Sequence, residues 1–200
     1  MKSPLTIIFL LALTFSTTAQ RRVSFYTTKI NKDQFDKCGK VSYLVANAQI
    51  KKQAGLLRIP IEAKAAKIFK DENSDRDFHV FKYLGDVKGT KLSLVQRIEY
   101  NDEYFYLVNR MTGAIDTLIG QPVFARNMRD FICVFNPGTD EKQRIQVCEM
   151  INGRVKTRVY LDAMENVVIG FVTCVNHNSF LAEDCSGSMY FRIHFKLSDE

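Results

Sequence analysis

The chain lacks several residues and motifs that mark well-known protein classes. Tryptophan is absent, and the 200 residues include only three histidines and four prolines. Without tryptophan, no repeat can be marked by a Trp–Asp pair. Gly-x-Ser-x-Gly elbows, phosphate-binding loops and dinucleotide fingerprints are also missing, so enzymes that depend on these motifs have no support. We therefore expect no catalytic site and no cofactor, apart from one candidate calcium loop.

A long apolar run occurs only in the first twenty residues, MKSPLTIIFLLALTFSTTAQ. Lys2 precedes an apolar stretch from Ile7 to Phe15, and small residues follow, as in a secretory signal peptide cleaved after Ala19. The stretch is too short for a membrane span, which needs about 20 apolar residues. The sequence thus predicts export, to the periplasm or the medium, with no transmembrane segment in the mature chain. The absence of Asn-x-Ser/Thr sequons agrees with a bacterial envelope protein.

Charge is unevenly distributed along the chain. Residues 20–70 hold 12 basic and 3 acidic side chains, whereas residues 71–200 hold 15 basic and 19 acidic ones. We expect a signal peptide at 1–19, a basic N-terminal segment at 20–55 and a β-rich domain at 56–200. The basic part could contact an anionic glycan, lipid or nucleic acid. We prefer solvated loop lysines because no compact basic cluster appears, and nucleic acid is not expected because aromatic residues do not interleave with the basic ones.

Strand patterns dominate the chain after residue 55. Short segments alternate polar and apolar residues and are separated by turn sequences such as MTG, NPGTD and NG. We expect strands at 56–63, 65–71, 78–85, 91–100, 103–110, 114–120, 122–125, 130–135, 144–150, 154–161, 166–175 and 189–197. A weak helical pattern occurs only at 34–53. The sequence therefore predicts an all-β fold of antiparallel meanders with at most one short N-terminal helix.

A faint repeat of about 40 residues runs through the second half of the chain. YLVNRMTGAIDTL aligns with IQVCEMINGRVKTRV, so that Gly113 matches Gly153 and Thr117 matches Thr157. Residues 103–176 thereby resemble the blades of WD40 and TolB-like β-propellers. The resemblance implies four-stranded meanders, but the mature chain has room for four blades at most, the lower limit for a closed ring. We expect blade-like meanders packed as a β-sandwich or a partial propeller.

Five cysteines, in an exported chain, permit disulfides. Cys174 and Cys185 flank the polar stretch VNHNSFLAED, and we predict a bridge between them. Cys133 and Cys148 fall on consecutive predicted strands, where they form either a second bridge or two buried thiols. Cys38 is then left without a partner.

Two segments carry candidate metal ligands. In DENSDRD, oxygen-bearing side chains recur at every second position, as in calcium loops, although Arg76 and Lys82 replace the glycine and glutamate of an EF-hand. The candidate calcium ligands are Asp71, Asn73, Asp75 and Asp77, and the alternative is a solvated hairpin loop. The second segment places His177, Glu183 and Asp184 near two cysteines, but the spacing matches no standard zinc site.

These features predict an exported β-rich binding module of unknown ligand, with a protein or glycan partner in the cell envelope. Two alternatives stay open. One is a secreted or periplasmic hydrolase whose site is assembled from distant strands, which requires converging carboxylates or a His–carboxylate pair in a cleft. The other is a structural component of a cell-surface assembly.

Overall fold

The computed structural model describes residues 23–39, 41–74, 76–137, 142–162 and 167–197. Within them the chain is almost entirely antiparallel β-structure, which confirms the predicted fold class. In chain order the elements are β1 (Val23–Ile30), α1 (Lys32–Asp36), β2 (Leu44–Val45), β3 (Lys52–Gln53), β4 (Leu56–Ile59), β5 (Lys67–Lys70), β6 (Val80–Val87), β7 (Leu92–Ile98), β8 (Glu103–Asn109), β9 (Ile115–Leu118), β10 (Pro122–Phe124), β11 (Asp130–Phe135), β12 (Arg144–Ile151), β13 (Arg154–Asp162), β14 (Ile169–Asn176), β15 (Ser179–Asp184) and β16 (Tyr190–Leu197).

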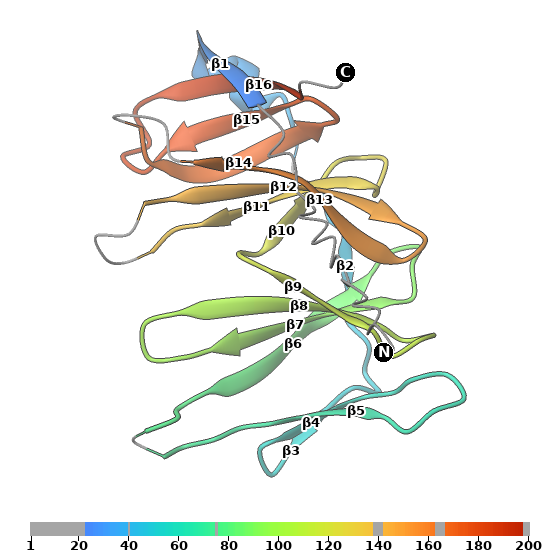
Figure 1. Cartoon of the computed structure of the whole chain (residues 1–200). Helices are drawn as coiled ribbons and strands as arrows, with labels where there is room; N and C mark the ends of the chain where they lie inside the picture. Colours follow the sequence, from blue (N-terminus) through green and yellow to red (C-terminus); the bar gives the residue numbers. More distant parts are fainter. Residues whose placement is uncertain (1–22, 40, 75, 138–141, 163–166, 198–200) are drawn as a thin grey trace, which may run out of the picture.

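The strands form four sheets that lie one above another (Figure 1). The first sheet has the order β3-β4-β5 and the second β2-β6-β7-β8-β9. The third is β10-β11-β12-β13, and the fourth is β1-β16-β15-β14. The first and fourth sheets lie at opposite ends of the stack (Figure 1), so the described residues form an open stack of meanders and no closed ring.

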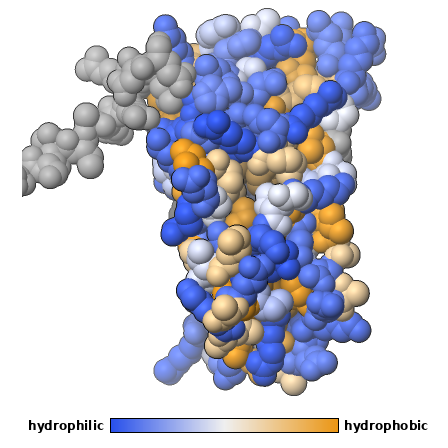
Figure 2. Space-filling view, turned by 90° about the vertical axis from the view of Figure 1, so that its right-hand side faces the viewer, coloured by the Kyte–Doolittle hydropathy of each residue, from blue (hydrophilic) through white to orange (hydrophobic). Residues whose placement is uncertain are grey.

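Each pair of neighbouring sheets encloses its own apolar core, because alternate residues of a strand point to opposite faces. In the third sheet, for example, Phe131 packs toward the second sheet and Ile132 toward the fourth. Leu57, Phe69 and Phe81 fill the core between the first and second sheets. Along one side of the stack, hydrophobic side chains reach the surface in small groups separated by hydrophilic ones (Figure 2).

The first and last described strands pair in the fourth sheet. β1 pairs antiparallel with β16 along its full length, from Val23 opposite Leu197 to Ile30 opposite Tyr190. The connecting segment, residues 41–50, then leads from the fourth sheet to the first, where the meanders begin. On the way, β2 pairs with the edge of β6, and the Tyr43 ring lies 5.0 Å from that of Phe124 in the third sheet. Residues 20–55 therefore contribute strands to three sheets of the β-rich fold.

The aligned hairpins occupy equivalent places in successive sheets. β8–β9 and β12–β13 are the last two strands of their meanders, and the matched Gly113 and Gly153 adopt φ of +76° and +71° in their turns. That left-handed conformation is readily available only to glycine. The side chain of Asn109 donates to the Gly153 carbonyl at 3.0 Å and so joins the two turns directly.

The expected short helix exists but is only five residues long. Its start is fixed by a capping box, in which the Asn31 side chain accepts from the Gln34 amide and the Gln34 side chain accepts from the Asn31 amide. Beyond Asp36 the predicted helical pattern is not followed, and residues 41–50 run mostly extended. Among the described residues, no helix has the length and apolar character that a membrane crossing requires.

Candidate functional site

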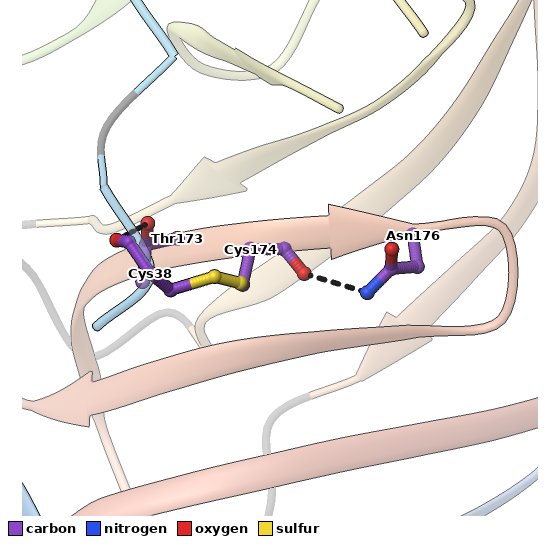
Figure 3. The surroundings of a disulfide bond; sticks show 4 residues. All are labelled: Cys38, Thr173, Cys174 and Asn176. Atoms are coloured by element: carbon purple, nitrogen blue, oxygen red, sulfur yellow. Dashed lines mark hydrogen bonds between the residues drawn. A yellow bond between two sulfur atoms is a disulfide. The ribbon is translucent and has the colours of Figure 1, made fainter. Parts of the chain in front are cut away.

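A disulfide attaches the N-terminal part of the chain to the fourth sheet (Figure 3). Cys38, just after α1, pairs with Cys174 on β14, with a Cα–Cα distance of 5.7 Å. Cys174 lies at an irregularity in the β14–β15 pairing and has a φ of +54°. Irregularities of this kind redirect a side chain out of the regular alternation. The Thr173 hydroxyl also donates to the Cys38 carbonyl, so a hydrogen bond joins the same two segments beside the disulfide.

The predicted bridge between Cys174 and Cys185 is wrong, because the two residues lie at different ends of one hairpin. β14 and β15 pair with Thr173 opposite Leu181 and Ile169 opposite Asp184. The Cys185 amide accordingly donates to the Val168 carbonyl at 2.8 Å, far along the strand from Cys174. Cys185 is an exposed free thiol.

The predicted bridge between Cys133 and Cys148 is also wrong, and the alternative of two buried thiols is what the structure shows. A bridge would need Cys133 opposite Cys148, and the observed strand register differs from that pairing by two residues. In the observed pairing, Cys133 lies opposite Gln146 and Cys148 opposite Phe131. Both thiols belong to the core between the second and third sheets, where burial raises the pKa of Cys133.

A groove runs between β10 and β14, each the outermost strand of its sheet, and the connecting segment lies in it. Inside the groove is a cavity of about 400 Å³. Its walls are mainly apolar and come chiefly from the connecting segment, from β10 and β11, and from β14. They include Val41, Pro122, Phe124, Val134 and Val172. Five of its lining residues carry polar side chains: Tyr43, Glu103, Gln121, Asn136 and Thr173.

Tyr43 is the main polar group of this cavity. Its hydroxyl accepts a hydrogen bond of 3.3 Å from the Gln121 amide, and burial raises its pKa. The hydroxyl therefore stays protonated at neutral pH and can donate to a ligand. An apolar cavity with a few convergent polar groups is the usual form of a binding site for a small molecule or a side chain.

A second cavity, of about 490 Å³, lies beyond the disulfide and shares Val41 and Cys174 with the first. A His–carboxylate pair lies in its wall: Asp130 is buried, and its Oδ1 is 3.2 Å from Nδ1 of His177. The other carboxylate oxygen accepts from the Asn127 side chain at 2.7 Å. Arg158, the extra residue of a bulge between β12 and β13, reaches the same turn and donates to the carbonyl of His177 and to the side chain of Asn178.

A carboxylate hydrogen-bonded to Nδ1 of an imidazole is an arrangement used in general base catalysis. A covalent mechanism would also need a nucleophile. Among the described residues that line this cavity, no serine, threonine or free thiol occurs, because Cys38 and Cys174 are joined to each other.

The other predicted metal segment is divided between the two ends of the β14–β15 hairpin. His177 lies at the turn, whereas Asp184 lies at the opposite end and organises the loop that follows. The Ser186 hydroxyl and the amides of Met189 and Ser188 donate to Asp184, and these hydrogen bonds lower its pKa to about 2. Over the part of the chain that the structure describes, no three His, Cys, Asp or Glu side chains gather as a metal site would require.

The candidate calcium ligands are placed as follows. Asp71 forms an ion pair with Lys52 and accepts from the Phe81 amide at 2.8 Å, which joins β3 to β6. Asn73 is exposed, and Asp77 contacts His79 at 3.3 Å. Asp75 lies outside the described residues. The calcium loop stays a prediction, and the described contacts give Asp71 a structural role of its own.

We expect Asp71→Ala to lower the free energy of unfolding by about 1–3 kcal/mol, because it leaves the Phe81 amide without its acceptor and breaks the ion pair with Lys52. The loss should be equal in calcium and in chelator, measured by urea denaturation. Asn73→Ala, an exposed change in the same loop, is the control and should alter stability by less than about 0.5 kcal/mol. A loss seen only in calcium would support the calcium loop instead.

Sequence reasoning missed the groove and the Asp130–His177 pair. The residues of the groove come from three distant segments, and Asp130 and His177 are 47 residues apart. Cys38 was the one sequence signal for this region. It has no other cysteine near it in the sequence, so any disulfide it forms must join distant parts of the chain.

Comparisons of the chain with protein-family models, with curated proteins and with solved structures found no match. The resemblance of residues 103–176 to propeller blades accordingly stays a prediction.

Proposed function

We propose that this protein is an exported β-rich binding module that takes an extended, apolar segment of a protein partner into the groove between β10 and β14. One observation carries the proposal. The cavity of about 400 Å³ lies between β10 and β14, each the outermost strand of its sheet, and an outermost strand is where an added strand can form backbone hydrogen bonds.

The chemistry of the cavity favours a peptide over a glycan. Val41, Phe124 and Val172 suit an aliphatic or aromatic side chain, and Tyr43 and Gln121 suit a backbone amide or carbonyl beside it. Export is supported by the signal-like N-terminus and by the disulfide, since such bonds persist in oxidising compartments.

We expect short extended peptides with a central aromatic residue, such as acetyl-Val-Phe-Val-amide, to shift the backbone amide resonances of β10 and β14. Val41→Phe should weaken this binding at least about tenfold, because the larger ring occupies the shared wall of both cavities. Binding is measured by NMR titration.

Val45→Phe is the matched control, since Val45 is exposed on the same segment and lines neither cavity. It should leave peptide binding unchanged. A response to a neutral oligosaccharide such as cellotetraose, with none to the peptides, would contradict the proposal. So would resonance shifts confined to other parts of the stack.

A further inference from the structure

The first sheet leaves one of its faces uncovered by any other described element. Its inner face packs Leu57 and Phe69 against the second sheet. On the outer face, Leu56 lies opposite Lys70 and Arg58 lies opposite Ile68, so that aliphatic and basic side chains alternate in both directions. Ile68 is 54% exposed although it is fully aliphatic. We call these four residues the end face.

The other end of the stack is different. There, α1 covers part of the outer face of the fourth sheet, and Phe35 is buried against Leu181 and Tyr190. The stack therefore has one partly closed end and one open end.

The end face is positively charged. Lys51 lies at its margin and is exposed, like Arg58 and Lys70. Within the described residues, none of these three cations makes an ion pair. Three of the neighbouring carboxylates are already engaged.

Those carboxylates come from three places around the sheet. Asp71 pairs with Lys52 on the inner side, and Glu62 pairs with Lys91 of the second sheet at 2.8 Å. Asp77, in the loop that leads to β6, contacts His79. These three carboxylates therefore do not pair with Arg58, Lys70 or Lys51. Glu72, two residues after Lys70, forms no ion pair with a described residue.

This combination identifies the partner by its chemistry. Exposed aliphatic groups enter the boundary of the acyl chains while lysine and arginine contact acidic headgroups, which is how peripheral proteins bind anionic bilayers. The end face has no aromatic ring of the kind that stacks on sugars or nucleic-acid bases. We propose that the open end of the stack docks on an anionic lipid surface through Arg58, Lys70 and Ile68.

Docking by this end places the long axis of the stack perpendicular to the membrane surface, so that the second sheet separates the groove between β10 and β14 from the lipid (Figure 1). The site is separate from the groove, so lipid binding and peptide binding can be tested independently.

The test is co-sedimentation of the purified protein with vesicles of 30% phosphatidylglycerol in phosphatidylcholine, compared with pure phosphatidylcholine. Binding to the anionic vesicles should exceed binding to the neutral ones and should fall as salt rises from 50 to 300 mM. Arg58→Glu with Lys70→Glu should weaken binding by about 30-fold or more, given about fivefold for each lost cation near the surface. Ile68→Gln should reduce the part of binding that persists at high salt.

Lys156→Glu with Lys196→Glu is the matched control, since both lysines are exposed on strands of the third and fourth sheets, away from the end face. It should bind as the unaltered protein does. Arg58→Gln with Lys70→Gln provides a milder variant, and thermal melts establish that every variant is folded. Equal binding of the end-face and control variants would overturn the proposal. Equal binding to neutral vesicles, or binding to heparin without binding to vesicles, would also overturn it.

Discussion

Replacing both members of the disulfide, Cys38→Ser with Cys174→Ser, is expected to lower the free energy of unfolding by about 5 kcal/mol. The bond closes a loop with a sequence separation of 136 residues, and the loss of chain entropy in the unfolded state grows with loop length. The effect should be measured by urea denaturation without reductant, as a fall in the midpoint with a steeper slope, because the unfolded chain without the bond is less compact.

Cys185→Ser is the control for this experiment. Cys185 is exposed and free, so the change should cost less than about 0.5 kcal/mol. Thiol labelling of the native protein should find one reactive cysteine, with the two buried thiols reacting after denaturation. A large loss of stability in Cys185→Ser would show that Cys174 pairs with Cys185 in solution.

The second large effect is expected for Phe131→Ala, which should cost about 3–5 kcal/mol. Phe131 is fully buried between the second and third sheets, with its ring centre 4.7 Å from that of Phe124. Removal of the ring leaves a cavity at an interface that joins the two halves of the stack. The loss is again measured by urea denaturation.

Phe25→Ala removes the same side chain from the edge strand β1, where Phe25 is 41% exposed. It should cost far less than Phe131→Ala, at most about 1 kcal/mol. Similar losses for the two variants would mean that the core between the second and third sheets is not a main source of stability.

The strands after residue 55 could be predicted from sequence because each carries its own local pattern. β11 and β12 alternate buried residues for two different cores, and turns such as Asn152-Gly153 separate the strands clearly. β15 was missed because its turn, at His177 and Asn178, contains no glycine or proline. The segment Ser179–Asp184 therefore looked like a continuation of a polar loop, although Phe180 and Ala182 are fully buried.

The arrangement of the sheets could not be predicted in this way, and the site depends on it. β1 has a strand-like sequence, but only its pairing with β16 brings Cys38 to Cys174. The groove exists because β10 and β14 are the outer strands of sheets that stack on each other, a property of topology and not of any local pattern. Spacing along the chain favoured Cys185 as the partner of Cys174, whereas the strand register excludes it.

The pairing of β1 with β16 also sets the order in which the molecule can be completed during synthesis. Among the described strands, β1 is synthesised first, yet its partner β16 is synthesised last. The first and third sheets consist of strands that follow one another directly in the chain, so each strand can pair as soon as the next one is made. β1 keeps an unpaired hydrogen-bonding edge until β16 has been made, so the fourth sheet is the last of the four to be completed.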